Sequence, residues 1–170
     1  GESSDLTFTN CFNAGAVSGV TNIGALRGDG TGSATNLFYD NQTSGASSTI
    51  GTGKTTAEMK QQATFTGWDF TTTPIWGIVE AHTYPFLDWR YNAISGTAYS
   101  DQGVTALANG KTISFAINGV MDSATASTTD GNGFYYALLD AVDIANPTRD
   151  VISDGDAVLI YFDNVAEDGN

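Results

Sequence analysis

The sequence predicts an all-β protein built from two different kinds of β-structure. A short segment that starts at Thr9 recurs from Thr35, in apolar pieces separated by Gly, Asn and Ser. The second half instead alternates apolar with polar residues and is punctuated by Asn-Gly and Asp-Gly pairs. Helical patterning is confined to one short stretch. We therefore expect the end of a right-handed β-helix-like β-solenoid, with an aromatic cap and one short helix, over residues 1–91, followed by an Ig-like β-sandwich over residues 92–170.

The repeat predicts how the first strands stack. Five of eleven consecutive positions that start at Thr9 recur unchanged in the segment that starts at Thr35. A repeat of this kind is one coil of a solenoid, which buries its apolar face only against the next coil. We expect Asn10 to stack on Asn36 and Phe12 on Phe38, because amide ladders and stacked rings stabilise such coils.

One short helix and an aromatic cap are expected after the repeat. Thr55 and Glu58 have the spacing of a capping box, so a helix should begin there, with Met59 and Ala63 on one face. The segment that follows is dense in aromatic residues and interrupted by Pro and Gly, which predicts short strands and turns that cover the solenoid end. The aromatic residues of this predicted cap are Phe65, Trp68, Phe70, Trp76, Tyr84, Phe86 and Trp89.

The second half has the pattern of half-buried strands. The clearest is 111–118, where Ile113, Phe115 and Ile117 alternate with polar residues. An Ig-like sandwich usually has about seven strands, and five or six are recognisable here, so the last strand is expected to be missing. The other predicted strands are 94–99, 121–128, 134–139 and 157–162.

Charge and composition exclude several classes of function. The 170 residues carry six Lys and Arg against 19 Asp and Glu, for a formal net charge of −13. Six scattered bases do not form the positive face that nucleic acid or anionic lipid requires. A single Cys and a single His exclude a multi-thiolate zinc site and any site that needs two imidazoles. No apolar run approaches the roughly 20 residues of a membrane helix, so no membrane insertion is expected.

Several motifs within residues 7–89 carry a family resemblance. They are Thr9-Asn10-Cys11-Phe12-Asn13-Ala14-Gly15, Ile23-Gly24-Ala25-Leu26, Asn36-Leu37-Phe38-Tyr39-Asp40, Gly53-Lys54-Thr55-Thr56-Ala57-Glu58-Met59 and Tyr84-Pro85-Phe86-Leu87. This part resembles the end of a passenger segment from large bacterial surface adhesins of the filamentous-haemagglutinin type that carry GLUG repeats. It departs from their Gly-Gly-Leu-Val-Gly core, where Ala25 and Arg27 replace a Gly and an apolar residue.

Residues 93–163 resemble the Ig-like modules that follow such solenoids. The motifs that carry this second likeness are Ile94-Ser95-Gly96-Thr97, Gly110-Lys111-Thr112-Ile113, Thr129-Asp130-Gly131-Asn132-Gly133 and Gly155-Asp156-Ala157-Val158. Together the two resemblances imply an extracellular, surface-displayed and non-enzymatic protein, and composition agrees, because charged residues make up only 15% of the chain.

Calcium is the ion that the sequence favours most. Oxygen ligands clustered in turns suit a hard cation, and five residues of the second module are candidates, although none fits a twelve-residue EF-hand loop. The alternative interpretation is turn chemistry of Asp and Asn on a solubilising surface. The candidate calcium ligands are Asp130, Asn132, Asp154, Asp156 and Asp163.

Other candidate sites have plainer structural interpretations. The segment Gly51–Thr55 lacks the first Gly of a phosphate loop, which favours a turn into the helix. Cys11 occupies an apolar repeat position equivalent to Leu37 and is predicted to be a buried small hydrophobe. His82 has no nearby nucleophile and acid of a hydrolytic triad, so we expect a structural histidine. A crosslink between Lys111 and Asn164 is a further alternative.

Three hypotheses of function remain open. The first is a non-enzymatic adhesin or stalk segment at the bacterial cell surface, with neighbouring modules, a surface glycan or a protein as partner; the aromatic cap would offer a glycan Trp68, Trp76, Tyr84 and Trp89. The second is a self-assembling extracellular filament subunit, completed by strand donation between subunits, because an open sheet edge is a template for another chain. The third is a polysaccharide-active enzyme, which would need an acid pair in a groove along many coils.

Overall fold

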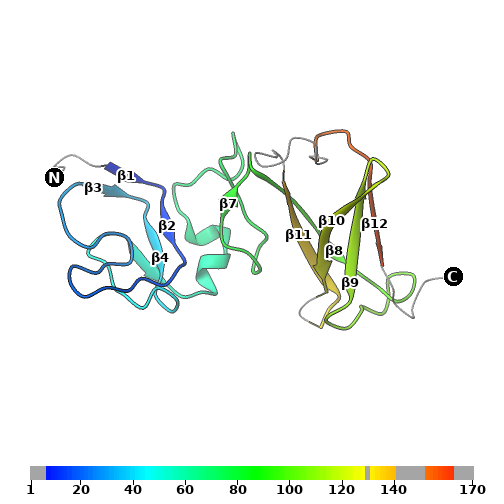
Figure 1. The fold of residues 1–170 in the computed structure, drawn as a ribbon, viewed down its shortest axis with the longest axis horizontal. Helices are drawn as coiled ribbons and strands as arrows, with labels where there is room; N and C mark the ends of the chain where they lie inside the picture. Colours follow the sequence, from blue (N-terminus) through cyan, green and yellow to red (C-terminus); the bar gives the residue numbers. More distant parts are fainter. Residues whose placement is uncertain (1–6, 129–130, 141–151, 163–170) are drawn as a thin grey trace. The chain divides into compact units, whose positions relative to one another are not determined.

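The chain was analysed in a computed structural model, which describes residues 7–128, 131–140 and 152–162, without the side chains of 121–127. These residues are mostly strands with almost no helix, which confirms the predicted all-β class (Figure 1). The chain divides into two compact units, Gly1–Phe86 and Leu87–Asn170. The sequence analysis placed the change of character a few residues later, after residue 91.

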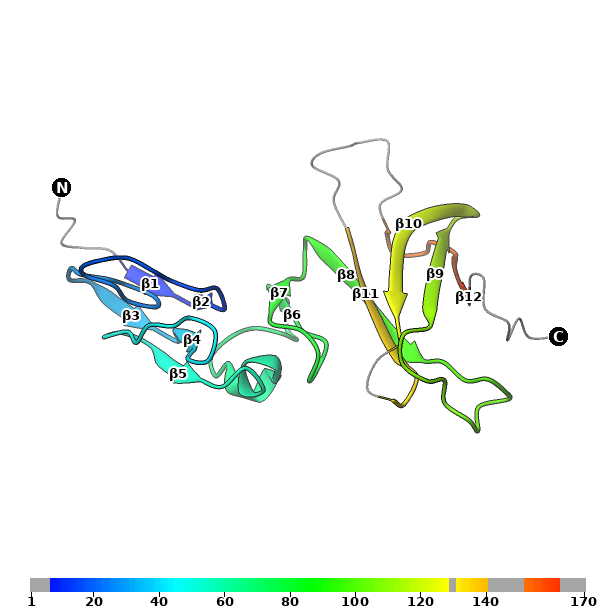
Figure 2. The same cartoon turned by 60° about the horizontal axis from the view of Figure 1, so that its bottom comes forward.

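The first unit contains a stack of short parallel strands, drawn from blue to cyan in Figure 2. The pairing follows the sequence repeat, because Thr9 lies opposite Thr35 and Phe12 lies opposite Phe38. A third layer follows after a shorter stretch of chain, with Phe38 opposite Thr52. The strands of this parallel stack are β1 (Thr7–Thr9), β2 (Phe12–Asn13), β3 (Ser33–Thr35), β4 (Phe38–Asp40) and β5 (Thr52–Lys54).

The predicted asparagine ladder is present. Asn36 Nδ2 donates to Asn10 Oδ1 at 3.1 Å, and both residues have left-handed backbone, with φ of 54° and 52°. Asparagine tolerates this conformation better than other residues with a side chain. Gly67 packs directly against the Asn36 amide, since a Cβ on Gly67 would lie 2.4 Å from Asn36 Nδ2. Asn10, Asn36 and Gly67 therefore lie in a row beside the strands, which we call the asparagine column.

The predicted capping box is present, but the helix it begins is not an α-helix. Thr55 N–H and Oγ1 both donate to Glu58 Oε2 at 2.8 Å, and Glu58 N–H donates to Thr55 Oγ1 at 3.2 Å. Two single-turn 3₁₀ helices follow, η1 (Glu58–Lys60) and η2 (Gln62–Thr64). The Glu58 carbonyl accepts from the Gln61 N–H and from Thr64 Oγ1, and the Lys60 carbonyl accepts from the Ala81 N–H, so neither makes the bond of an α-helix. Met59 is buried and Ala63 is exposed, although the sequence predicted that they share one helix face.

Aromatic side chains from the repeat and from the predicted cap form one core. Phe38, Phe65 and Trp68 are buried together with Met59, and the Trp68 and Trp76 ring centroids lie 4.3 Å apart. The Trp68 indole N–H donates to the Asn36 carbonyl at 2.9 Å, which ties this core to the asparagine column. The partly buried side chains packed against the core are Phe12, Phe70, Trp76, Ile78 and Tyr84. A two-stranded sheet, β6 (Trp76–Gly77) with β7 (Phe86–Leu87), follows.

The second unit consists of antiparallel sheets with longer strands. β9 (Thr112–Ile117) lies in the middle of a three-stranded sheet, between β10 (Val120–Ser127) and β12 (Val158–Phe162). β8 (Tyr91–Thr97) pairs along its whole length with β11 (Phe134–Asp140) in a second sheet. All five strands overlap the segments predicted from the alternation of apolar and polar residues.

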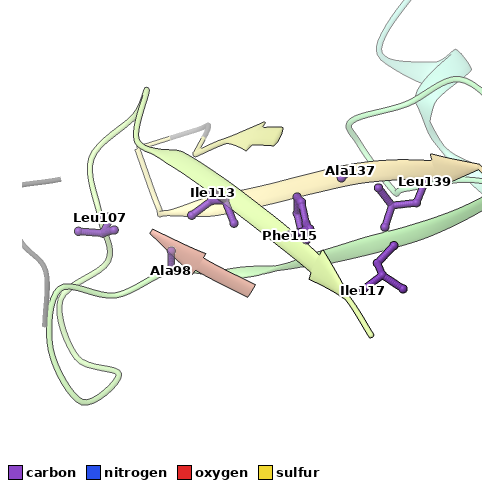
Figure 3. Close-up of a cluster of buried hydrophobic side chains, with 7 residues drawn as sticks. All are labelled: Ala98, Leu107, Ile113, Phe115, Ile117, Ala137 and Leu139. Carbon is purple, nitrogen blue, oxygen red and sulfur yellow. The ribbon is translucent and has the colours of Figure 1, made fainter. Parts of the chain in front are cut away.

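Aliphatic side chains and one phenylalanine form the core of this unit (Figure 3). Ile113, Phe115 and Ile117 of β9 are fully buried, as their alternation predicted. The prediction was wrong for the opposite face of β9, because Ser114 and Ala116 are also buried. Small side chains on a central strand are shielded by the strands on either side. The other buried members of the core are Ala98, Leu107, Ala137 and Leu139.

Within the described residues, no helix is long and apolar enough to cross a bilayer.

Candidate functional site

The structure describes three of the five predicted calcium ligands. Asn132 lies in the exposed turn before β11, and Asp154 and Asp156 lie in the turn before β12. Asp130 and Asp163 lie outside the described residues. Among the residues that are described, no three His, Cys, Asp or Glu side chains gather closely enough to hold a metal ion. Calcium binding therefore stays a prediction.

Asp156 shows what one of these carboxylates does. Its Oδ1 accepts from Asn118 Nδ2 at 2.8 Å, and its Oδ2 accepts from the Ser153 N–H at 2.7 Å. The Asn118 amide and the Ser153 N–H lower the pKa of Asp156. Asn118 Oδ1 also accepts from the Ala157 N–H at 3.1 Å. Both carboxylate oxygens thus organise the turn that leads into β12, as the turn-chemistry interpretation proposes for Asp and Asn. The sequence indicated a turn at Asn118 but not its contact with Asp156, because the two residues lie far apart along the chain.

A pocket of about 290 Å³ opens in the second unit where β8, β9, β11 and β12 have their ends. Ile113 lies on its wall and is also part of the fully buried core, so the pocket reaches that core. Tyr99 and Ile160 are well exposed and belong to its outer part. The lining residues are Thr97, Ala98, Tyr99, Asp101, Ile113, Tyr135, Ile160, Tyr161 and Phe162.

Asp101 lines this pocket on a loop that its own carboxylate organises. Its Oδ1 accepts from the N–H groups of Val104 at 2.8 Å and Thr105 at 2.9 Å. The Ser100 N–H donates to the Thr105 carbonyl, which closes the loop. The backbone and hydroxyl of Thr105, followed by the Val104 N–H, lower the pKa of Asp101, so the carboxylate is ionised at neutral pH. The pocket therefore has one fixed negative charge.

Three tyrosines supply the aromatic part of the pocket lining. Tyr99 follows β8, Tyr135 lies in β11 and Tyr161 lies in β12. Burial raises the pKa of Tyr135, so its phenol is neutral. The sequence analysis did not select these residues, because only the folded sheets bring the ends of the three strands together.

The edge of β12 beside this pocket is apolar. Val158, Leu159 and Ile160 are 36%, 61% and 38% exposed. Within the described residues, β12 pairs only with β9. An exposed apolar strand with a free side is a surface on which another extended chain can pair.

Asp40 is the most deeply buried acid of the described first unit, and its role is structural. Tyr84 donates its hydroxyl proton to Asp40 Oδ2 at 2.7 Å, and the Gln42 and Thr43 N–H groups donate to Oδ1. Burial alone would raise the pKa of Asp40, but hydrogen bonds from Thr56, Tyr84 and the two backbone groups together hold it below its usual value. Burial and the Asp40 carboxylate in turn raise the pKa of Tyr84.

Most of the aromatic rings that could form a carbohydrate-stacking platform are packed against one another in the predicted cap. Trp68 is buried, and the rings of Trp76 and Tyr84 both contact Phe12 with centroids 6.2 Å away. Trp89 differs, since it is 55% exposed and does not belong to the buried aromatic core. Most of these rings are used to build the core of the first unit.

The structure also shows the surroundings of Lys54 and Cys11, which belong to two other motifs considered in the sequence. Lys54 lies at the end of β5 and pairs with Glu58 at 3.4 Å, at the start of the capping box. Cys11 was predicted to be buried and is exposed. Leu37, its equivalent in the next layer, is buried and packs against Gly51, whereas Cys11 lies in the outermost layer of the described stack. For the crosslink, Asn164 lies outside the described residues.

Comparisons with known proteins give one partial likeness. The chain is 43% identical to a protein of Evansella cellulosilytica named "Putative Gly-rich membrane protein", over an 89-residue alignment. That alignment covers 46% of this chain and 10% of the relative, so the chain spans a small part of the relative's length. No protein-family profile matches the chain, and no solved structure matches it.

Proposed function

We propose that this chain is a non-enzymatic structural and adhesive segment of an extracellular bacterial surface protein, an adhesin or stalk. In this proposal the first unit is the end of a β-solenoid of the GLUG-repeat type. The second unit is an Ig-like β-sandwich.

The observation that carries the proposal is the parallel stack that follows the sequence repeat. Identical residues lie over each other in successive layers: Thr9 over Thr35, and Phe12 over Phe38. The amides of Asn10 and Asn36 form a hydrogen bond across the same layers. Layers of this kind build elongated, rigid bodies from short repeats, which suits a spacer that holds a binding surface away from the cell.

The composition of the chain and the name of its relative support the proposed location at the cell surface. The chain is acidic, poor in Lys and rich in small polar residues, which is typical of extracellular β-proteins. The relative is named as a membrane protein, and this chain matches only 10% of it. A long protein attached to an envelope would have room for such a spacer segment.

Labelling of intact cells tests the location. Antibodies raised against the purified chain are applied to cells that make the protein, before and after permeabilisation. The proposal expects equal labelling in both samples and loss of the signal after external protease treatment. Labelling that requires permeabilisation contradicts it.

Replacement of the segment in the protein that carries it tests the mechanical role. One strain carries a Gly/Ser linker of equal length in place of residues 7–86, and a control strain carries a second copy of those residues. A spacer predicts weaker attachment of the linker strain to surfaces and normal attachment of the control. Equal attachment of both strains contradicts the role.

The second candidate is a filament subunit completed by strand donation, and the apolar edge of β12 favours it. Purified chain is imaged by negative-stain microscopy with calcium and with a chelator. Ordered fibres of uniform width support the candidate, and fibres lost on chelation add a calcium site. Leu159→Lys places a charge on the strand edge and should abolish the fibres. Compact monomers in both conditions contradict the filament.

A further inference from the structure

We propose that the pocket lined by Tyr99, Asp101 and Tyr161 binds the guanidinium or ammonium group of an arginine or lysine side chain on an extended segment of a partner polypeptide. This site goes beyond the spacer role and does not depend on the protein's location.

The pocket lining has the chemistry that a cation requires. The lining residues include three tyrosines and one aspartate, and Tyr99 and Tyr135 supply the ring faces, because the Tyr161 side chain points away from the core face of β12. An aromatic face attracts a cation electrostatically, and a phenol oxygen accepts a hydrogen bond from its N–H groups. Hydrogen bonds between a guanidinium or ammonium and a carboxylate are stronger than bonds between neutral groups. Asp101 supplies the carboxylate, and its loop fixes it in place.

The negative charge of the second unit favours a cationic ligand over an anionic one. Residues 92–170 contain 11 acids and two bases, a formal net charge of −9. Such a field repels anions and attracts basic segments. At this pocket a basic segment is favoured over a segment from a second copy of this acidic chain, because the second copy would bring like charges together.

The size of the pocket favours one side chain. A volume of about 290 Å³ lies at the lower end of ligand pockets, which span roughly 300–1,000 Å³. An oligosaccharide would extend far beyond it. A single arginine or lysine side chain enters such a space while the rest of the ligand lies outside.

The neighbouring strand edge explains why the ligand is an extended polypeptide. Ile160 and Tyr161 of β12 line the pocket, and Val158 and Leu159 continue the same strand as an exposed apolar edge. Within the described residues this edge is free. A segment that pairs with it would place alternate side chains toward the pocket, which is the recognition mode of strand addition.

A peptide titration followed by NMR tests the proposal. The full chain, labelled with ¹⁵N, is titrated with the peptide acetyl-Thr-Val-Arg-Val-Thr-amide. The matched control peptide has citrulline at the centre, which keeps the shape of arginine and removes its charge. We expect shifts of the amides of 97–101 and 160–162, and binding at least about tenfold weaker for citrulline, the loss expected when a charge-assisted pair becomes neutral. A lysine peptide should bind nearly as well as the arginine peptide, and free arginine amide more weakly.

Two matched variants locate the site. Asp101→Asn keeps the oxygen that accepts from Val104 and Thr105 but removes the charge, and it should weaken the arginine peptide by about fivefold to tenfold. Asp88→Asn removes the same unit of charge from the segment between β7 and β8, which does not line the pocket, and should change binding by less than about twofold. The ¹⁵N spectrum of each variant shows whether the fold is retained.

Three outcomes would overturn the proposal. Equal binding of the arginine and citrulline peptides would leave strand pairing at β12 without a cation site. Equal weakening by the two variants would show that the net negative charge of the chain attracts the peptide, with no specific role for Asp101. Absence of any shift at millimolar peptide would remove the site altogether.

Discussion

The two units hold short β-strands together by different means. In the first unit the strands are two or three residues long and parallel in the stack, and Asp40 and Ser44 are among its most deeply buried side chains. In the second unit the strands are five to eight residues long and antiparallel, and the core cluster is apolar. Short ladders provide few backbone hydrogen bonds, so the first unit relies on side-chain amides, a buried carboxylate and packed rings.

This contrast predicts different kinds of fragility. A buried polar network loses stability when one partner is removed, because the remaining donors are left without acceptors. An apolar core loses stability in proportion to the volume removed. The substitutions below separate these two mechanisms.

The largest effect is expected from Phe115→Ala in β9. Phe115 is fully buried at the centre of the second core. Its loss removes a large ring and leaves a cavity, at a cost of about 3–5 kcal/mol in the free energy of unfolding of this unit. Hydrogen exchange of the β9 and β11 amides measures the change.

A surface substitution in the same unit is the control for Phe115→Ala. Leu159 is 61% exposed in β12, so Leu159→Ala should change the same free energy by less than about 0.5 kcal/mol. Similar costs for the two variants would mean that the apolar core does not hold the second unit together.

The next largest effect is expected from Asp40→Ala. The variant leaves the Gln42 and Thr43 N–H groups and the Tyr84 hydroxyl without their acceptor. Loss of three partly buried hydrogen bonds to a fully buried carboxylate should cost about 2–3 kcal/mol in total. Tryptophan fluorescence during urea unfolding follows the first unit through Trp68 and Trp76. Asp40→Asn, which keeps one acceptor oxygen, should cost less.

The same carboxylate gives the first unit a pH dependence. The folded pKa of Asp40 lies below its unfolded value of 3.8. Its contribution to stability is therefore fully present above that unfolded value and is lost as pH falls through the folded pKa. Urea midpoints of the first unit measured from pH 7 down to pH 2 should fall more steeply for the wild type than for Asp40→Asn. Parallel curves would show that Asp40 does not contribute to the acid sensitivity.

Residues that repeat or alternate in the sequence led to the correct elements. The repeat that starts at Thr9 and Thr35 predicted that Asn10 would lie against Asn36, and the alternation of Ile113, Phe115 and Ile117 predicted a buried face. Both patterns can be recognised in the sequence because residues that repeat or alternate occupy equivalent environments in the fold. The capping box of Thr55 and Glu58 was found for the same reason, because its chemistry lies within one turn of chain.

Contacts between distant segments were not predictable in this way. The short helix expected after Thr55 consists of 3₁₀ turns, where Gln61 has extended backbone and the Lys60 carbonyl accepts from Ala81, from a distant part of the chain. Cys11 and Leu37 have equivalent positions, but only Leu37 is buried, where it packs against Gly51 from a later layer. The pocket of Tyr99, Asp101 and Tyr161 requires the register of two sheets, which no single segment encodes.

A smaller effect is expected where the asparagine column meets Gly67. Gly67 has φ of +83°, and a Cβ there would clash with the Asn36 amide. Gly45 has a similar φ of +66° and open space around its Cβ position. Both Gly→Ala variants should lose about 1–2 kcal/mol from left-handed strain. Gly67→Ala should lose more and should also displace the side-chain amide resonances of Asn10 and Asn36. Equal losses would mean that the column tolerates displacement at no cost.

The smallest effect is expected at the capping box. Thr55→Ala removes the hydroxyl that accepts from the Glu58 N–H and donates to Glu58 Oε2. Loss of such a cap costs about 1 kcal/mol, and Thr55→Ser should restore most of it. Urea unfolding followed by tryptophan fluorescence measures both variants against Asp40→Ala. The Glu58 side chain is 46% exposed, so water can replace a lost partner in the capping box, whereas Asp40 is fully buried. A cost for Thr55→Ala as large as that for Asp40→Ala would therefore show that burial does not set the strength of the polar contacts in the first unit.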